Sequence, residues 1–447
     1  KSCPKLKVLN ITSSSSSDVI KIVYDIPSFI KSIDGFCSQN SETLEEIIIP
    51  SSVEKLKEST FEKCNKLKKI TLDTSKTKPE PKSLFQSIHS LEQLVISSSA
   101  TSIKEGIFEG CSMIQKVTFE LPSKLTNFEN NAFKDCSSLT EITIPPLTES
   151  IGNQAFSGCS GLIEITIPSS VHRIGSNAFY DCSSLEEISI PSSVTQLGEY
   201  VFGECSSLKQ VTMTSVTSIG SNSFKGCSSL KEITIPSSVA SIGKEAFSDC
   251  SLLNSISIPS SVTSIGESVF AGCSSLKEIE IPSSVMILHP SSFERCTKLE
   301  KITFDPSKTE YNLKMFQICP SLHFLNISPT TSFIQSSAFK NCTSITEIII
   351  PSSVTSIKSY AFSGCSSITE IIIPSSVKSI ERYAFNDCSS LTAISLPSSV
   401  PSLEGYTFAG CFSLEKITIP LSIQSIGFHC FYECKLLKEI LIPSSVT

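Results

Sequence analysis

Residues 162–182, LIEITIPSSVHRIGSNAFYDC, contain the pattern that decides the fold. Its opening, Leu162-x-x-Ile165-x-Ile167, alternates apolar and polar positions, which is typical of a short strand with one buried face. Pro168 has no N–H group to donate and therefore ends this strand. The rest of the unit is expected to return along the outside and to plant five further side chains in the core: Val171, Ile174, Ala178, Phe179 and Cys182.

The unit recurs along nearly the whole chain. Cysteines follow one another at steps of 23 residues from Cys227 to Cys434, and a phenylalanine stands three residues before each of them. The register continues towards the N-terminus through Cys111 and then passes Ile88, which replaces cysteine. One unit cannot bury its apolar face alone, whereas stacked units bury one another. We therefore expect residues 1–447 to form a single array of about 19 repeats.

The composition is that of a folded protein without special charge. Of the 447 residues, 40% are hydrophobic and 18% are charged, and the formal net charge is −7. This mild acidity argues against a general nucleic-acid binder. No apolar run approaches the roughly 18–20 residues that cross a bilayer, so no membrane insertion is predicted within this segment. The chain begins at Lys1 and ends at Thr447 within a repeat, so both ends are expected to be truncated.

The consensus Leu-x-x-Ile-x-Ile-Pro-Ser-Ser-Val-x-x-Ile-Gly-x-x-Ala-Phe-x-x-Cys-Ser-Ser resembles the BspA-type leucine-rich repeats of anaerobic bacteria and parasitic protists. The resemblance implies a repeat solenoid, a leucine-rich-repeat horseshoe. One short parallel β-strand per 23-residue repeat would lie on its concave face, with irregular or short helical turns on the convex face. It also implies a cell-surface or secreted protein that adheres to host matrix, host cells or other microbes.

Three units depart from the consensus, near residues 10–45, 73–96 and 305–328. The second and third resemble each other, because Asp73-Thr-Ser75 is echoed by Asp305-Pro-Ser307. This echo indicates duplication of a block of about ten units. Either the anomaly is inherited drift, or both units reshape the surface for a partner.

The glycine slot after Ile174 is read as a corner of the coil. Glycine recurs there in several units, yet Lys358 and Glu381 occupy the same slot elsewhere. A position that strictly required a positive φ would not readily accept those side chains. The slot is therefore interpreted as an exposed corner where glycine is merely convenient.

The recurring cysteine occupies an inward slot, about 5 Å from its equivalents in neighbouring units. That spacing is within reach of a disulfide, but every interior cysteine would have two equal partners. Free cysteine packs well as a small apolar residue, so we predict a ladder of buried thiols, with scattered disulfides as the alternative. The run His429-Cys430-x-x-x-Cys434 has no second cluster to complete four zinc ligands. No metal and no cofactor are predicted.

No enzymatic activity is predicted. A nucleophile, a base and an orienting group must converge, whereas a stacked solenoid keeps distant units apart. The sequence also lacks a glycine-rich phosphate loop. The histidines fall in different slots of distant units, at positions 89, 172, 289, 323 and 429.

The concave face holds the candidate binding residues. An outward position two residues after the repeat leucine is repeatedly acidic, at Glu141, Glu164, Glu187, Glu232, Glu278, Glu347 and Glu370. This column is either a solvated face or an acidic strip that meets a basic partner. Ile349 and Ile372, with Phe324 nearby, are expected to form an apolar patch on the same face.

The function predicted from these features is a non-enzymatic adhesion scaffold. It would hold a protein or a glycan on the concave face, at the cell surface or in secreted form. The alternative is a cytoplasmic scaffold for protein–protein interaction on the same face. The sequence names neither the partner nor the oligomeric state.

Overall fold

The computed structural model describes residues 23–26, 29–33, 44–61, 64–80, 82–307, 310–311, 319 and 321–447. The chain divides into two compact units, Lys1–Leu230 and Lys231–Thr447. In each unit the backbone winds into stacked coils, and the coils pair through parallel strands, as the repeat pattern predicts. The expectation of one array across all 447 residues stays a prediction.

A first strand column in each unit is formed by the Leu-x-x-Ile-x-Ile segment. In the N-terminal unit it comprises β1 (Val23–Asp25), β3 (Glu46–Ile48), β5 (Lys69–Leu72), β7 (Gln93–Ile96), β9 (Lys116–Phe119), β11 (Glu141–Ile142), β14 (Glu187–Ser189) and β16 (Gln210–Thr212). In the C-terminal unit it comprises β18 (Glu232–Thr234), β20 (Ser255–Ser257), β22 (Glu278–Glu280), β24 (Lys301–Phe304), β26 (Phe324–Ile327), β28 (Glu347–Ile349), β30 (Glu370–Ile372), β32 (Ala393–Ser395) and β34 (Lys416–Thr418).

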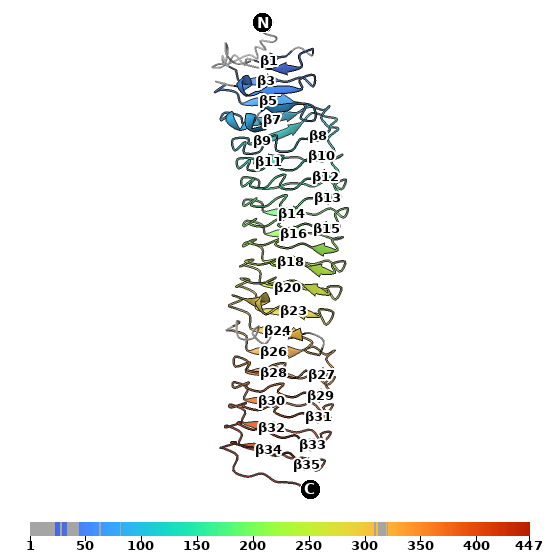
Figure 1. Cartoon of the computed structure of the whole chain (residues 1–447), viewed down its shortest axis with the longest axis vertical. Coiled ribbons are helices and arrows are strands. Elements are labelled where there is room, and N and C mark those ends of the chain that lie inside the picture. Colours follow the sequence, from blue (N-terminus) through green and yellow to red (C-terminus); the bar gives the residue numbers. More distant parts are fainter. Residues whose placement is uncertain are drawn as a thin grey trace, which may run out of the picture. The chain divides into compact units, whose positions relative to one another are not determined.

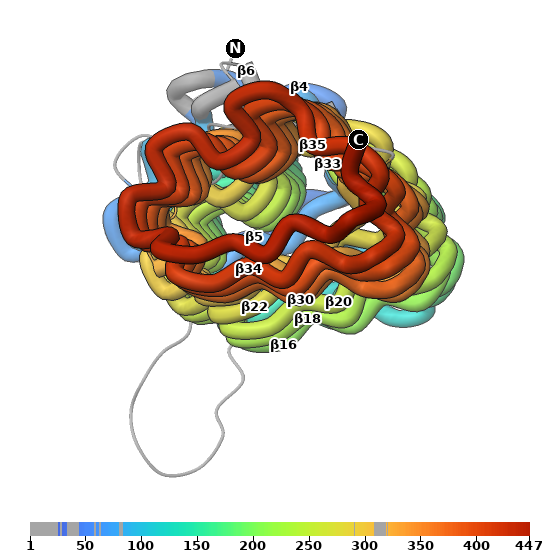
Figure 2. The backbone as a smooth tube through the Cα atoms, turned by 90° about the horizontal axis from the view of Figure 1, so that it is seen from below, coloured from blue at the N-terminus to red at the C-terminus, as the bar shows by residue number. Residues whose placement is uncertain are grey.

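A second strand column was not anticipated from the sequence. In the N-terminal unit it comprises β2 (Ser32–Ile33), β4 (Lys55–Lys57), β6 (Lys78–Glu80), β8 (Ser102–Ile103), β10 (Asn127–Phe128), β12 (Ser150–Ile151), β13 (Arg173–Ile174), β15 (Gln196–Leu197) and β17 (Ser218–Ile219). In the C-terminal unit it comprises β19 (Ser241–Ile242), β21 (Ser264–Ile265), β23 (Ile287–Leu288), β25 (Glu310–Tyr311), β27 (Phe333–Ile334), β29 (Ser356–Ile357), β31 (Ser379–Ile380), β33 (Ser402–Leu403) and β35 (Ser425–Ile426). In Figure 1 the labels of β27, β29, β31, β33 and β35 form a row apart from those of β26, β28, β30, β32 and β34, and Figure 2 shows β30 and β34 on a different side of the coil from β33 and β35.

The third side of each coil is a turn segment that is also hydrogen-bonded to its neighbour. The Phe156 N–H donates to the Ala178 carbonyl at 2.8 Å, and the Phe179 N–H donates to the Val201 carbonyl at 2.9 Å. This path requires a left-handed residue at two slots per coil, as at Asn177 (φ 57°) and Asp181 (φ 55°) in one coil. Helix is limited, within the described residues, to three 3₁₀ segments: η1 (Glu58–Phe61), η2 (Lys82–Ser87) and η3 (Pro290–Phe293).

The core of each coil repeats the same side chains at the same depth. Phe179 stacks between Phe156 and Phe202, with ring centroids 5.5 and 5.6 Å away and planes within 7° of parallel. Beside this stack, the Cys182 thiol donates to the Phe156 carbonyl oxygen at 3.2 Å. Sixteen cysteines, from Cys111 to Cys434, are free thiols, which confirms the predicted ladder for that part of the chain. Cys64 is disulfide-bonded.

For Gly175, the interpretation of the glycine slot is confirmed in its backbone conformation and wrong in its exposure. Gly175 does not have a positive φ, but it is buried rather than exposed. A Cβ atom on Gly175 would lie 2.5 Å from the Asn153 backbone nitrogen and 2.6 Å from the Gly152 carbonyl carbon. At Gly175, the neighbouring coils therefore approach too closely for a side chain. Where the slot holds charged residues instead, they pair, as Lys358 and Glu381 do at 2.8 Å.

The irregular units share an Asp-centred turn. Asp73 accepts hydrogen bonds from the Ser75 N–H at 3.0 Å and from the Ser75 hydroxyl at 2.6 Å, and Asp305 accepts the same pair from Ser307 at the same distances. Both aspartates are buried and shape the turn from inside, whereas Ser75 and Ser307 are half-buried. Most of the predicted irregular unit near residues 10–45 lies outside the described residues.

Candidate partner-binding face

The outward side of the first strand column, called the strand face below, carries every candidate residue. All seven predicted glutamates are exposed on it. In the N-terminal unit a lysine interrupts the acidic column. Strand β11 pairs with β9, which places Glu141 opposite Lys116. Their side chains form an ion pair of 2.9 Å, so Glu141 does not present an isolated negative charge. Glu164 and Glu187 are direct neighbours across a parallel bridge.

The strand face of the C-terminal unit begins with mixed charge. Glu232 lies opposite Ser255, and Glu278 lies opposite Lys301 with an ion pair of 3.4 Å. The Lys301 ammonium also lies 5.6 Å from the ring centroid of Phe324 in the next coil. The acidic column predicted from spacing alone is therefore interrupted by lysine. Exposed ion pairs of this kind contribute little to stability. Their main effect is to reduce the net negative charge of the strand face.

The apolar candidates converge further along this face. β26 pairs with β28 so that Phe324 lies opposite Glu347, while Asn326 lies opposite Ile349. Ile372 holds the slot of Ile349 in the following coil, on β30. Their side chains are unusually open to solvent, since Ile349 is 49% and Ile372 76% exposed. The structure thus brings the predicted apolar patch together on adjacent coils.

A hollow of about 540 Å³ opens beside Ile372. Ala393 and Ser395 form its floor in the register of Glu370 and Ile372, because β30 pairs directly with β32. Small side chains at slots that elsewhere hold Glu, Thr or Ile leave the space unfilled. Lys416 borders the far side, opposite Ala393 on β34. The hollow therefore has an isoleucine wall, with a carboxylate and an ammonium group at its rim.

Sequence reasoning missed the small residues of this hollow. Ala393 replaces the repeated Glu of its column, and Ser395 replaces Thr or Ile. That substitution of small for large residues was the signal that was available. The repeat pattern is defined by the large side chains that recur, so a position where a small residue leaves space does not stand out in it.

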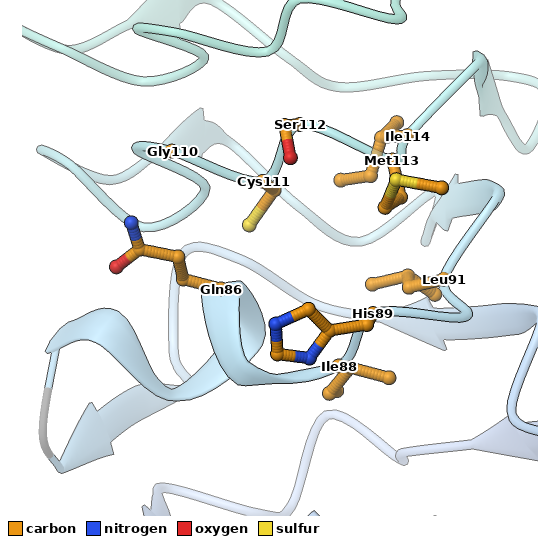
Figure 3. Close-up of a pocket in the computed structure, with 9 residues that line it drawn as sticks. All are labelled: Gln86, Ile88, His89, Leu91, Gly110, Cys111, Ser112, Met113 and Ile114. Carbon is orange, nitrogen blue, oxygen red and sulfur yellow. The ribbon is translucent and has the colours of Figure 1, made fainter. Parts of the chain in front are cut away.

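A smaller hollow of about 180 Å³ in the N-terminal unit lies between two coils (Figure 3). Gln86, Ile88, His89 and Leu91 line it from one coil, and residues 110–114 from the next. It places a cysteine near a histidine, but burial raises the pKa of the Cys111 thiol to about 12. His89 has its Nδ1 atom 2.9 Å from the Ser87 carbonyl oxygen and forms no described hydrogen bond to Cys111. A protonated thiol without a base is not a nucleophile.

The same argument extends along the thiol ladder. Burial raises the pKa of Cys205 to about 12 and that of Cys434 to about 11, although hydrogen bonds from the backbone of the preceding ladder cysteine lower both. These thiols therefore stay protonated at neutral pH. Within the described residues there is no cluster of three or more His, Cys, Asp or Glu side chains able to hold a metal ion. None of the helices in that part of the chain is long and apolar enough to cross a membrane.

Comparison with known families decides the classification. A family model described as "BspA type Leucine rich repeat region (6 copies)" matches residues 15–140, 126–253, 217–346 and 332–447. The chain belongs to the BspA-type leucine-rich repeat family. Proteins with this repeat are, in general, protein-interaction scaffolds without a catalytic centre of their own. No curated protein sequence matches this BspA-type chain.

Two solved structures are similar to this chain to different degrees. A leucine-rich repeat protein from Bacteroides ovatus is 32% identical, with a TM-score of 0.50, over 77% of this chain and 86% of that one. A leucine rich cell surface protein from Faecalibacterium prausnitzii is 25% identical over 84% of this chain and 88% of that one, with a TM-score of 0.35. The first of these supports both the family and the leucine-rich-repeat fold.

Proposed function

We propose that this BspA-type protein is a non-enzymatic adhesin that holds a protein partner on the strand face between β26 and β34. The observation that carries the proposal is the exposed Ile372 beside the 540 Å³ hollow. When a partner covers an isoleucine that is 76% exposed, the burial contributes roughly 1.5–3 kcal/mol to the free energy of binding. A partner side chain that enters the hollow would have the anchor geometry of an interface hot spot.

The charges around the hollow suggest which partner surface fits. Glu347 and Glu370 are exposed on the Ile372 side, whereas Lys416 lies on the other side. We expect an apolar anchor on the partner, flanked by basic residues facing the two glutamates and by an acidic residue facing Lys416. Glu278, a further candidate in the same unit, belongs to an ion pair and is proposed only as a contributor at the edge. Glu141 forms its ion pair in the N-terminal unit and is not assigned to this site.

We place the protein at the cell surface or in secreted form, on the strength of its family. The test is to label intact source cells with a membrane-impermeant amine reagent. Tagging of this chain supports surface exposure, while tagging only after lysis favours the cytoplasmic scaffold. The reagent has targets because lysines such as Lys231 and Lys277 are exposed.

The strand-face proposal is tested with two matched variants. Ile372→Asp removes the exposed apolar side chain beside the hollow, and Leu147→Asp makes the same kind of change at a side chain that is 57% exposed in the N-terminal unit. Proteins crosslinked to wild-type chain on intact cells should be lost with Ile372→Asp and kept with Leu147→Asp. If both variants capture the same proteins as wild type, the hollow is not the binding site.

A further inference from the structure

Three tyrosines occupy one turn slot in consecutive coils of the C-terminal unit. Tyr360, Tyr383 and Tyr406 have φ values of 60°, 59° and 60°, in the left-handed region. In many other coils this slot holds a short polar residue that tolerates that conformation, at Asn131, Asn177, Asn222 and Ser268. Large side chains also occupy the slot at Gln154, Tyr200, Glu245 and His429, but three consecutive tyrosines occur there only once among the described coils.

The three rings form a stack at the protein surface. The centroids of Tyr360 and Tyr383 are 4.6 Å apart with planes at 5°, and those of Tyr383 and Tyr406 are 4.7 Å apart at 7°. The outer faces are covered as well, because the Lys340 ammonium lies 5.0 Å from Tyr360 and His429 stacks on Tyr406 at 5.1 Å. Solvent therefore reaches the ring edges and hydroxyl groups and not the ring faces.

The phenol groups are available for hydrogen bonding. Among the described residues, none accepts a hydrogen bond from or donates one to the Tyr360, Tyr383 or Tyr406 hydroxyl group. Each hydroxyl can both donate and accept. The stack thus presents a row of three such groups at the spacing of successive coils.

Arg382 is fixed beside this row. Its guanidinium carbon lies 4.7 Å from the Phe428 centroid, 5.4 Å from Tyr383 and 5.9 Å from Tyr406. The side chain is exposed, and no carboxylate of the described chain forms an ion pair with it. A guanidinium held against aromatic rings, with no carboxylate partner, has N–H groups left to bind a carboxylate, phosphate or sulfate group.

We propose that Tyr360, Tyr383, Tyr406 and Arg382 bind an acidic glycan, a chain of pyranose rings that carries carboxylate or sulfate groups. The sugar hydroxyl groups would exchange hydrogen bonds with the phenols, and the acidic group would pair with Arg382. A single-stranded nucleic acid fits poorly, because bases need open ring faces and these faces are covered. An acyl chain fits poorly against a hydroxyl-bearing edge. This site lies on the turn side of the coil and is independent of the strand face.

Other charges nearby set the expected selectivity. Glu381 is held by Lys358 at 2.8 Å and by the Ser359 N–H at 3.0 Å, so its carboxylate is already neutralised. Glu404 is exposed next to Gly405 and Tyr406, and no ion pair is described for it. It therefore opposes an anionic ligand, and its removal should strengthen binding.

The experiment measures binding of three hexasaccharides to the full chain by isothermal titration calorimetry at low salt. The probes are hyaluronan (carboxylate only), heparin (carboxylate and sulfate) and maltohexaose (neutral). At least one acidic probe should bind, and maltohexaose should not. The comparison of hyaluronan with heparin shows which acidic group is recognised.

Matched variants assign the site. Arg382→Gln should weaken binding about tenfold, as expected for the loss of a charge-assisted contact. Lys378→Gln removes a positive charge from the same coil at an exposed position and should have no effect. Tyr383→Asn installs the residue found at this slot elsewhere and should weaken binding, whereas Tyr200→Asn at the equivalent slot of the other unit (φ 53°) should not. Glu404→Gln should tighten binding.

Three results would overturn the proposal. The first is failure of both acidic probes to bind the wild-type chain. The second is equal loss with Arg382→Gln and Lys378→Gln, which would indicate only general charge attraction. The third is binding of maltohexaose as tightly as the acidic probes. Unchanged circular dichroism spectra confirm that each variant is folded, and capture of proteins by the strand face is unaffected by any of these outcomes.

Discussion

Gly175→Ala should destabilise the N-terminal unit although it adds only a methyl group. The added Cβ would lie 2.5 Å from the Asn153 backbone nitrogen, whereas ordinary contact begins at 3.4 Å. The coils would have to separate by the difference, about 0.9 Å. Two hydrogen bonds resist this separation: the Gly175 N–H donates to the Ile151 carbonyl at 2.8 Å, and the Ser176 N–H donates to the Asn153 side-chain oxygen at 3.0 Å.

The magnitude follows from two opposing effects. Overpacking of a close contact costs about 1–3 kcal/mol. Replacing glycine by alanine at a permitted φ recovers about 0.4–1 kcal/mol by restricting the unfolded chain. The net loss at Gly175 is therefore about 1–2 kcal/mol. At Gly198 the nearest atom to an added Cβ is the Ser176 hydroxyl at 3.3 Å, so Gly198→Ala should be neutral or slightly stabilising.

The assay is urea unfolding of the full chain, followed by far-ultraviolet circular dichroism. Repeat arrays do not always unfold in one step, so hydrogen exchange at residues 151–176 provides a local measurement of the same effect. Gly175→Ala should lower the midpoint and speed exchange in that segment, while Gly198→Ala should do neither. Equal midpoints for the two variants would refute the reasoning, because the two glycines share a slot and differ in their contacts.

Three further predictions concern the core. Phe179→Ala should cost about 3–5 kcal/mol of stability, since the ring is fully buried between two stacked neighbours; an unchanged urea midpoint would contradict this. Burial raises the pKa of Asp305, but hydrogen bonds from Ser307, Thr331 and Thr330 lower it more, so its folded pKa lies below 3.8. The ionised Asp305 therefore stabilises the folded state at pH values above the pKa that this residue has in the unfolded chain. This stabilisation is lost as the pH falls through the pKa of Asp305 in the folded protein. Asp305→Asn should therefore cost about 1.5–3 kcal/mol at pH 7, and the difference from wild type should shrink below about pH 4 in unfolding measured as a function of pH. Ellman's reagent should react with the fifteen buried free thiols only on unfolding; rapid reaction of most of them in the folded protein would disprove their burial.

The sequence predicted which residues lie on the candidate face, but it did not predict which charges pair across it. The outward slots of Glu347, Ile349, Glu370 and Ile372 follow directly from strand alternation. The Lys116–Glu141 pair was not predicted, because only the acidic members of this outward column were considered and Lys116 belongs to the same column. Residues in register across coils lie 22–25 positions apart, so only the strand pairing shows which charges meet.

The sequence by itself determined the period, the inward slots and the first strand column. These depend on apolar positions within one unit, where alternation and a strand-ending proline such as Pro168 act locally. Tertiary structure decided the second strand column, the left-handed turn ladder, the close approach at Gly175 and the hollow beside Ile372. Each of these is a relation between neighbouring coils. It depends on the distance and register of residues that the one-dimensional pattern treats as equivalent, so it emerges only when the coils are stacked.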